Sequence, residues 1–265
     1  MNNRLTRCLA RAGKNKEKLF CAYVMLGYPS VAKTEAVVRV LEQAGTDILE
    51  LGFPFSDPLA DGPTIQYASE HAIRNGVTLE DAFRVVKRLR HRGIEIPILF
   101  FSYLNPILCY GASRFVRRLQ ASGFDGSIVP DLPPEEGKEL ETMLRQSRLS
   151  MVYLVAPTTR RNRMRAIAGR SNGFIYYVSL RGITGARRAV PRDLVKTVKI
   201  LKRLTRKPVL VGFGISQPEQ VRTITRVADG VVVGSAIIDR LRNGAGVPSI
   251  GGYISRLVRA LKTRR

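Results

Sequence analysis

The most informative part of the chain lies near its C-terminus and reads PVLVGFGISQPEQVRTITRVADGVVVGS (residues 208–235). Two short apolar runs, at 208–211 and 229–233, are each followed by a glycine, and the residues between them mix polar and apolar types as a helix does. Ser216, with Glu219 three residues later and Pro218 between them, indicates that this helix begins with a capping box. The segment therefore predicts two strands joined by a helix.

The same alternation of an apolar run and an amphipathic segment recurs along the whole chain. Most runs are continuously apolar, which is typical of strands that are covered on both faces. Eight such alternations, with no linker or low-complexity tract between them, favour a closed parallel barrel over an open sheet. We expect an α/β fold, a single (β/α)8 TIM barrel domain over residues 1–265. The expected strands are 20–25, 47–51, 97–101, 126–130, 151–155, 174–178, 208–211 and 229–233, and clear amphipathic helices fall at 34–44, 78–90, 112–121 and 192–205.

Length and composition agree with this expectation. A chain of 265 residues is close to the roughly 250 of one such barrel. No window approaches the roughly 20 uninterrupted apolar residues of a membrane span. The N-terminal segment lacks the apolar core of a signal peptide, and Leu5, Cys8, Leu9 and Ala12 instead predict a short helix across the barrel floor. We expect a cytoplasmic protein.

The cysteines and the net charge do not indicate a special function. Cys8, Cys21 and Cys109 are far apart, without a CxxC motif or a Cys/His cluster, so we interpret all three as structural and Cys21 as a small hydrophobe within a strand. The formal charge of +23 attracts anions. Because the arginines are spread over most expected helices, no single basic stripe indicates a nucleic-acid partner.

In a barrel of this kind the catalytic groups lie at the carboxyl ends of the strands. Glu50 belongs to an otherwise apolar strand and should point into the barrel mouth, where an apolar pocket raises a carboxyl's tendency to keep its proton and suits it to acid–base work. The alternative is a structural carboxylate paired with an arginine. Asp61 follows in a loop held by Pro54 and Pro58, where it is either an acceptor for a substrate N–H or a solvated loop or N-cap residue.

Glycines after the last two strands indicate a phosphate site. Gly212, Gly214, Gly234 and Ser235 fall where these barrels commonly hold phosphate, with backbone N–H groups at a helix start, and Gly185 is a further possible donor. The alternative is that the glycines only relieve crowding in tight turns.

Absent residue types narrow the chemistry. No lysine lies at the carboxyl end of an expected strand, which disfavours a Schiff-base aldolase, and the two histidines lie in helical segments, which disfavours a metal-dependent one. Carboxylate acid–base chemistry on a phosphorylated, rather apolar substrate remains. Candidates for the pocket wall, each equally plausible as barrel core, are Tyr23, Phe101, Ile128, Tyr176 and Phe213.

Several longer motifs, in order and over nearly the whole chain, resemble those of the tryptophan synthase alpha chain family. They are ELGFPFSDPLADGPTIQYA (50–68), GFDGSIVPDLPPEE (123–136), LVAPTT (154–159), GFIYYVSLRGITGAR (173–187), VGFGISQPEQV (211–221) and ADGVVVGSAII (228–238). The resemblance implies a lyase that cleaves indole-3-glycerol phosphate to indole and glyceraldehyde 3-phosphate by a retro-aldol reaction.

The resemblance also implies roles for individual residues. Glu50 matches the acid–base carboxylate, Asp61 the carboxylate that accepts the indole N–H, and Tyr176 a pocket tyrosine close to Glu50. Thr184 matches a lid residue that contacts Asp61. The implied phosphate cradle consists of Gly185, Gly214, Gly234 and Ser235.

A partner is implied as well. The loop around Asp57 and Pro58 resembles the face that docks a separate, pyridoxal-phosphate-dependent beta subunit, in an alpha2beta2 complex that receives the indole. The resemblance implies neither a cofactor nor a metal on this chain. The competing interpretations are indole-glycerol-phosphate synthase, which is expected to use a lysine that we do not find, and a silent barrel that only activates the beta subunit.

Overall fold

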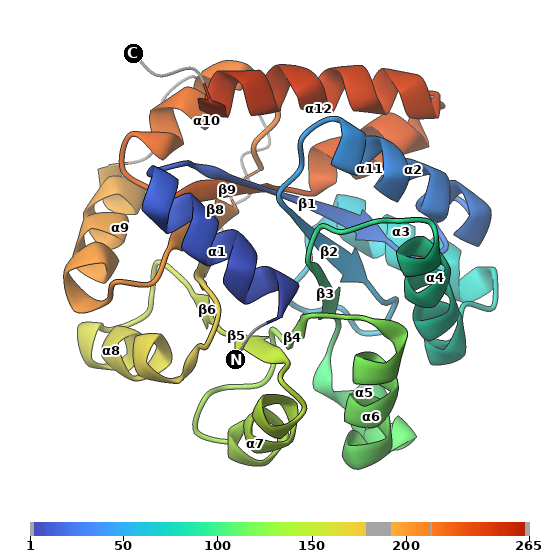
Figure 1. Ribbon diagram of the computed structural model, residues 1–265, viewed down its shortest axis with the longest axis horizontal. Coiled ribbons are helices and arrows are strands. Elements are labelled where there is room, and N and C mark those ends of the chain that lie inside the picture. The colour runs from blue at the N-terminus through green and yellow to red at the C-terminus, as the bar shows by residue number, and fades with distance from the viewer. Residues whose placement is uncertain (1–2, 179–191, 213, 263–265) are drawn as a thin grey trace.

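The computed structural model describes residues 3–178, 192–212 and 214–262, and nine parallel strands within them form one sheet. The strand order β5-β4-β3-β2-β1-β9-β8-β7-β6 places two strands that are consecutive in the chain at opposite edges. These two, β5 and β6, are the halves of the run expected at 151–155, divided at Tyr153. The sheet therefore closes through that run into an eight-stranded barrel whose fifth strand is interrupted, and the predicted α/β barrel is confirmed (Figure 1).

Helices separate the strands and surround them. The strands are β1 (Leu19–Met25), β2 (Ile48–Gly52), β3 (Ile98–Phe101), β4 (Gly126–Ile128), β5 (Ser150–Val152), β6 (Leu154–Val155), β7 (Ile175–Val178), β8 (Val209–Gly212) and β9 (Gly230–Val233). The helices are α1 (Arg4–Asn15), α2 (Val31–Gln43), α3 (Pro63–Arg74), α4 (Leu79–His91), α5 (Leu104–Tyr110), α6 (Ala112–Ser122), α7 (Lys138–Gln146), α8 (Arg161–Arg170), α9 (Arg192–Leu204), α10 (Pro218–Thr225), α11 (Ser235–Arg242) and α12 (Val247–Lys262). Among the described residues, no helix combines the length and apolar character that a membrane crossing requires.

An aspartate stands directly before each of β2, β4 and β9. The carboxylates of Asp47, Asp125 and Asp229 each accept a hydrogen bond, at 2.9–3.0 Å, from a backbone N–H near the start of the preceding neighbour strand, β1, β3 or β8. These side chains satisfy N–H groups that would otherwise lack a partner at the barrel floor. The strands expected at 47–51 and 229–233 accordingly begin one residue later than the apolar pattern suggested.

The floor is covered by α1, as predicted from its apolar residues. Leu5, Cys8 and Ala12 are buried, and Figure 1 shows α1 lying across the end of the barrel inside the ring of outer helices. Gly173 leaves room for this contact, because a Cβ there would lie 3.0 Å from a methyl group of Leu5. The helix thus closes the end of the barrel opposite the carboxyl ends of the strands.

A buried ion pair reinforces the floor. Arg90 on α4 donates to the Asp125 carboxylate at 2.8 Å, and its side chain also donates to three backbone carbonyls. The side chains of Arg90 and Asp125 are only 10% and 2% exposed, so each needs the other to offset the cost of burying its charge.

One predicted helix start was wrong by a residue. The N-cap of α10 is Gln217 rather than Ser216, with Pro218 at the first helical position. The side chain of Gln220 accepts hydrogen bonds from the backbone N–H groups of Ser216 and Gln217, at 2.9 and 3.0 Å. An amide therefore performs the role that the sequence pattern assigned to Glu219.

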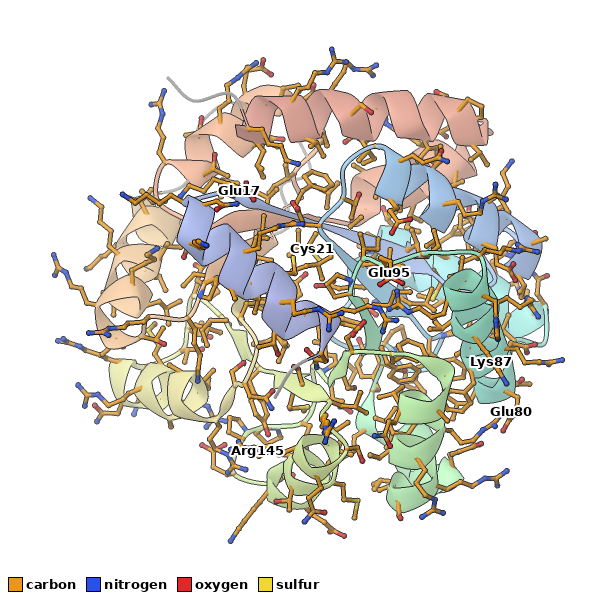
Figure 2. All side chains as sticks on the ribbon, viewed as in Figure 1. Glu17, Cys21, Glu80, Lys87, Glu95 and Arg145 are labelled. Atoms are coloured by element: carbon orange, nitrogen blue, oxygen red, sulfur yellow. The ribbon has the colours of Figure 1, made fainter. Side chains whose placement is uncertain are left out.

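Most of the charge lies on the outside of the barrel. In Figure 2 basic side chains project around the whole circumference, as Lys87 on α4 and Arg145 on α7 illustrate. The positive charge of the described residues is distributed rather than gathered over one element, as expected from the sequence.

Candidate active site

The carboxyl ends of the strands surround a cavity of about 320 Å³ at the end of the barrel opposite α1. Six of its wall residues come from strands β1, β3, β7, β8 and β9, and the rest from the loops and helix starts that follow strands. Residues predicted for the site that line this cavity are Tyr23, Asp61, Phe101, Tyr176, Gly214, Gly234 and Ser235, together with Gly212.

Glu50 lies beneath this cavity, inside the barrel. It pairs in register with Tyr23 of β1 and Leu99 of β3, and its side chain is fully buried. Its Oε1 is 3.5 Å from the Sγ of Cys21, while its Oε2 has no hydrogen-bond partner in the part of the chain that the structure describes. Burial raises the pKa of Glu50 from 4.5 to about 8, which the Cys21 hydrogen bond only partly opposes. At neutral pH the Glu50 carboxyl therefore keeps its proton.

Asp61 lines the cavity itself, on the loop between β2 and α3. Its Oδ2 accepts a hydrogen bond from the Tyr103 hydroxyl at 3.1 Å, and that hydroxyl accepts one from the backbone N–H of Ala60 at 3.0 Å. Burial raises the pKa of Asp61 from 3.8 to about 6, against the lowering effect of Tyr103. Asp61 is thus ionised at neutral pH, and it does not cap α3, whose N-cap is Gly62.

Tyr103 is a neighbour of the candidate site residue Asp61 that the sequence reasoning missed. It follows β3 by two residues, so its place near the carboxyl end of a strand was a signal that could have identified it. Its hydroxyl holds the Asp61 loop through two hydrogen bonds, one from Ala60 and one to Asp61.

Two tyrosines form the deep wall of the cavity. The rings of Tyr23 and Phe101 pack edge to face with centroids 5.5 Å apart. A Cβ at Gly52 would lie 2.1 Å from the Tyr23 hydroxyl, and one at Gly212 would lie 2.7 Å from the Tyr176 ring. Glycine at these two strand ends therefore makes space for the tyrosines. Burial raises the pKa of both tyrosines well above 10, so both stay neutral.

The start of α11 faces the same cavity. Gly234 is the N-cap and provides no side-chain cap, and Ser235 is the first helical residue. Gly214, opposite them, has a φ of +61°, a conformation that favours glycine. Uncapped N–H groups at the positive end of a helix, beside glycine backbone, form a suitable binding surface for a phosphate group.

Some predicted residues lie elsewhere. Ile128 is fully buried in β4, in register with Phe101, and does not line the cavity. Asp57 and Pro58 lie at the surface of the loop above the mouth, next to Leu59, which is 93% exposed. Three further predicted residues, Thr184, Gly185 and Phe213, lie outside the described residues.

A second chamber of about 470 Å³ adjoins the first and was not predicted. The two share Ala60, Asp61, Phe101, Tyr176 and Val178, which places Asp61 at their junction. The additional lining comes from residues 129–134, from Tyr153, Leu154, Ala156 and Thr159 in and around β6, and from Arg163 and Ile167 of α8.

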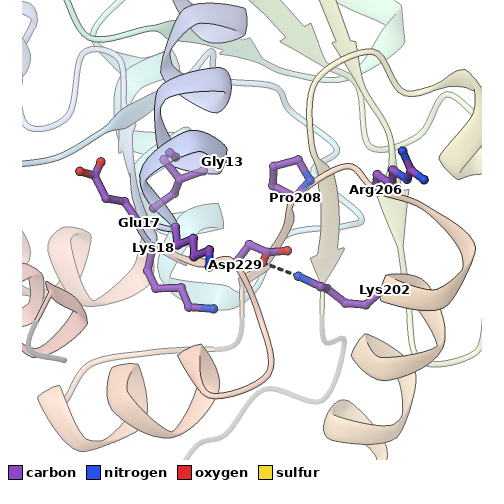
Figure 3. A pocket seen from close by; sticks show the side chains of 10 residues that line it. Gly13, Glu17, Lys18, Lys202, Arg206, Pro208 and Asp229 are labelled. Carbon is purple, nitrogen blue, oxygen red and sulfur yellow. Dashed lines mark hydrogen bonds and ion pairs between the residues drawn. The ribbon is translucent and has the colours of Figure 1, made fainter. Parts of the chain in front are cut away.

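The opposite end of the barrel contains a separate cavity of about 260 Å³ (Figure 3). Its wall includes Lys16, Lys18, Lys202, Arg206 and Asp229. Lys202 pairs with Asp229, and Lys18 donates to the Ala228 carbonyl. These contacts, and the proximity of the C-terminal ends of α1 and α9, account for the basic residues, because cations stabilise the negative end of a helix.

The arrangement provides acid–base chemistry on a phosphorylated ligand. Asp61, an ionised carboxylate, and a helix start suited to a phosphate line one pocket, and the neutral carboxylic acid of Glu50 is buried in the barrel beside Tyr23, a residue of the pocket wall. Two carboxyl groups with separated pKa values are typical of sites in which one group acts as an acid and the other, ionised, stabilises positive charge. In the described residues no three His, Cys, Asp or Glu side chains are grouped as metal ligands are.

Comparisons with known proteins show the family of the chain. Residues 9–250 match the family model described as tryptophan synthase alpha chain. The tryptophan synthase alpha chain of Geotalea daltonii is 43% identical and aligns over 98% of this chain and 97% of its own, and that of Chloroflexus aggregans is 43% identical over 97% and 98%.

Solved structures give the same result. The tryptophan synthase alpha subunit of Legionella pneumophila (strain Paris) superposes with a TM-score of 0.91 at 33% identity, covering 98% of this chain and 99% of the other. A chain of the tryptophan synthase of Mycobacterium tuberculosis superposes with a TM-score of 0.91 at 34% identity, over 100% of both. With its barrel, its two carboxyl groups and its full-length similarity, the chain belongs to the tryptophan synthase alpha chain family.

Proposed function

We propose that Glu50 and Asp61 together carry out the reaction of this family on indole-3-glycerol phosphate. The chain is a carbon–carbon lyase that releases indole and glyceraldehyde 3-phosphate, and it needs no cofactor of its own. The observation that carries the assignment of roles is the separation of the two pKa values, about 8 for Glu50 and about 6 for Asp61. Near neutral pH the first residue is an acid and the second an anion.

Glu50 ends this scheme protonated, as it began, because the hydroxyl of the substrate replaces the proton that Glu50 gives to the ring. Protonated Glu50 donates its proton to C3 of the indole ring, and positive charge develops on the ring nitrogen. Asp61 accepts a hydrogen bond from the indole N–H and stabilises that charge, because a fixed anion acts where charge appears in the transition state. The Glu50 carboxylate then removes the proton from the hydroxyl next to the bond that breaks. The C–C bond electrons return to the ring, an aldehyde forms, and Glu50 is again protonated.

The residues that line the cavity support this substrate. We place the phosphate at Gly214, Gly234 and Ser235, where backbone N–H groups and a helix start meet it. The indole then lies against Tyr23, Phe101 and Tyr176, between the two carboxyl groups. We also propose that Gly185 contributes to the phosphate site, and that Phe213 and the lid residue Thr184 complete the pocket.

The beta subunit of tryptophan synthase is the partner that the family implies, and it carries the pyridoxal phosphate. We propose that Asp57 and Pro58, on the exposed loop above the mouth, belong to the docking surface in an alpha2beta2 complex. The loop connects that surface directly to Asp61, since the Asp61 N–H donates to the Pro58 carbonyl at 3.0 Å. A cytoplasmic location, next to the other enzymes of amino-acid synthesis, is part of this proposal.

The decisive experiment measures glyceraldehyde 3-phosphate release from indole-3-glycerol phosphate by the purified chain, with and without a cognate beta chain. We expect turnover that rises with the beta chain, is lost in Glu50→Gln and in Asp61→Asn, and is unchanged in Glu139→Gln, which removes a charge from the exposed face of α7. The pH profile of kcat/KM should be bell-shaped, with an acid limb near 6 from Asp61 and an alkaline limb near 8 from Glu50.

The controls separate the alternatives. Absence of turnover from folded wild-type protein in both conditions contradicts the lyase and favours a silent barrel that activates the beta chain. Full activity of Glu50→Gln leaves the lyase intact but overturns the assignment of the acid.

A further inference from the structure

Cys21 is a buried nucleophilic side chain that the proposed reaction does not use. It lies on β1, two residues before Tyr23, so both side chains point into the barrel. Cys21 is 0% exposed, and its Sγ lies 3.5 Å from Oε1 of Glu50. Figure 2 labels Cys21 close to the barrel axis, beyond α1.

No charged side chain of the described residues pairs with Glu50. The groups that face it are Cys21 and Tyr23 from β1 and Tyr176 from β7. The negative charge of Asp61, on the loop above, raises the pKa of both tyrosines. The residues beside Glu50 on β2, and its register partner on β3, are leucines. The thiol is therefore the hydrogen-bonding group of the described residues that reaches the Glu50 carboxyl.

We propose that Cys21 is a positioning residue for Glu50, whose S–H donates to Oε1 and thereby assigns the acidic proton to Oε2. In a protonated carboxyl one oxygen carries the hydrogen and the other accepts hydrogen bonds. A donor on Oε1 makes that oxygen the carbonyl-like acceptor. The proton then resides on Oε2, the oxygen without a partner among the described residues, and in the proposed reaction this is the oxygen that gives the proton to the substrate.

The proposed role depends on the thiol being a weak hydrogen-bond donor. A hydroxyl at this position is a stronger donor and stabilises the carboxylate, which favours the wrong protonation state for an acid at neutral pH. An apolar residue leaves both oxygens equivalent, so the acidic proton has no preferred site. A thiol, a weak donor, orients the carboxyl while leaving it protonated.

The test titrates Glu50 in wild type, Cys21→Ser and Cys21→Ala. The readout is the infrared C=O band of the protonated carboxyl, identified by its absence in Glu50→Gln. We expect the midpoint to move down in Cys21→Ser and up in Cys21→Ala, each by about half to one pH unit. The matched control is Cys8→Ser, which changes another buried thiol, 3.5 Å from the Asp47 carbonyl on the floor, and should leave the midpoint unmoved.

Kinetics provide the second readout, and this arm rests on the proposed function. The alkaline limb of kcat/KM should follow the infrared midpoint, and Cys21→Ala should lower kcat at neutral pH by roughly threefold to tenfold with KM nearly unchanged. A purely structural role lowers stability without moving either midpoint.

The outcomes are distinguishable. Midpoints that coincide in all three proteins overturn the inference, even if the lyase is active. If the wild type has no lyase activity but the infrared midpoint still shifts in the Cys21 variants, the proposed function is contradicted and the contact between Cys21 and Glu50 is established. If Cys21→Ala does not fold, Cys21→Ser decides: a downward midpoint supports the inference and an unmoved one refutes it.

Discussion

Replacing Glu50 by glutamine turns a buried ionisable carboxyl into an amide of nearly the same shape, and we expect the change to stabilise the fold increasingly as the pH rises. The folded-state pKa is about 8, against 4.5 for the free side chain, because burial disfavours the charged form. Between these two values the folded protein holds a proton that the unfolded chain has released. Stability therefore falls through this window as the pH rises.

The magnitude follows from the two pKa values. At 1.36 kcal/mol for each pKa unit, the complete cost of ionising Glu50 in the folded state is about 5 kcal/mol, present above pH 8 and absent below pH 4.5. From about pH 5.5 to about pH 8.5, the wild type should lose about 3 kcal/mol relative to Glu50→Gln. The pH dependence of the difference is the informative quantity, because burying the amide has a cost that does not change with pH.

The assay is urea unfolding followed by far-UV circular dichroism at both pH values, since the chain has no tryptophan for fluorescence. The control is Glu139→Gln, which removes a carboxyl from the exposed face of α7 and should shift stability by only tenths of a kcal/mol at either pH. A difference between Glu50→Gln and wild type that is equal at both pH values refutes the reasoning, because it means that the buried carboxyl does not titrate in this window.

Three further substitutions follow from the contacts. Tyr103→Phe removes a donor that lowers the pKa of Asp61, so the acid limb of kcat/KM should move up by about half a pH unit, and an unmoved limb contradicts the role of that hydroxyl. Gly212→Ala places a methyl group 2.7 Å from the Tyr176 ring and should raise KM about tenfold, with a native far-UV circular dichroism spectrum. An unchanged KM would mean that the Tyr176 ring moves aside without loss of substrate binding. Asp125→Ala leaves a buried guanidinium unpaired and should lower the free energy of unfolding by about 3–5 kcal/mol in urea titrations, with kcat preserved at permissive temperature, whereas a loss below 1 kcal/mol argues that water replaces the carboxylate.

The barrel was predictable because its signal is local. Apolar runs in regular alternation with amphipathic segments need no knowledge of distant contacts, and the strands and α1 appear within a few residues of their expected places. The interruption at Tyr153 was not predictable, because it depends on how β5 meets β4 and β6 meets β7.

The site was predictable where it depends on strand ends. Tyr23, Phe101 and Tyr176 line the cavity because each stands at or near the carboxyl end of its strand. Tyr103 stands just as close to a strand end, yet its role arises only when the Asp61 loop folds back over it. Ile128 satisfies the same local rule but is covered, since exposure depends on which side chains stand above it.

The amino-acid sequence by itself determined the order of strands and helices, the family, and the residue types available for proton transfer. Only the tertiary structure decided what those residues do at neutral pH. The register of β1 against β2 brings a thiol to Glu50, and the closed barrel removes water from both, which raises the pKa of that carboxyl to about 8. Desolvation is a property of everything that surrounds a group, so no local pattern in the chain can specify it.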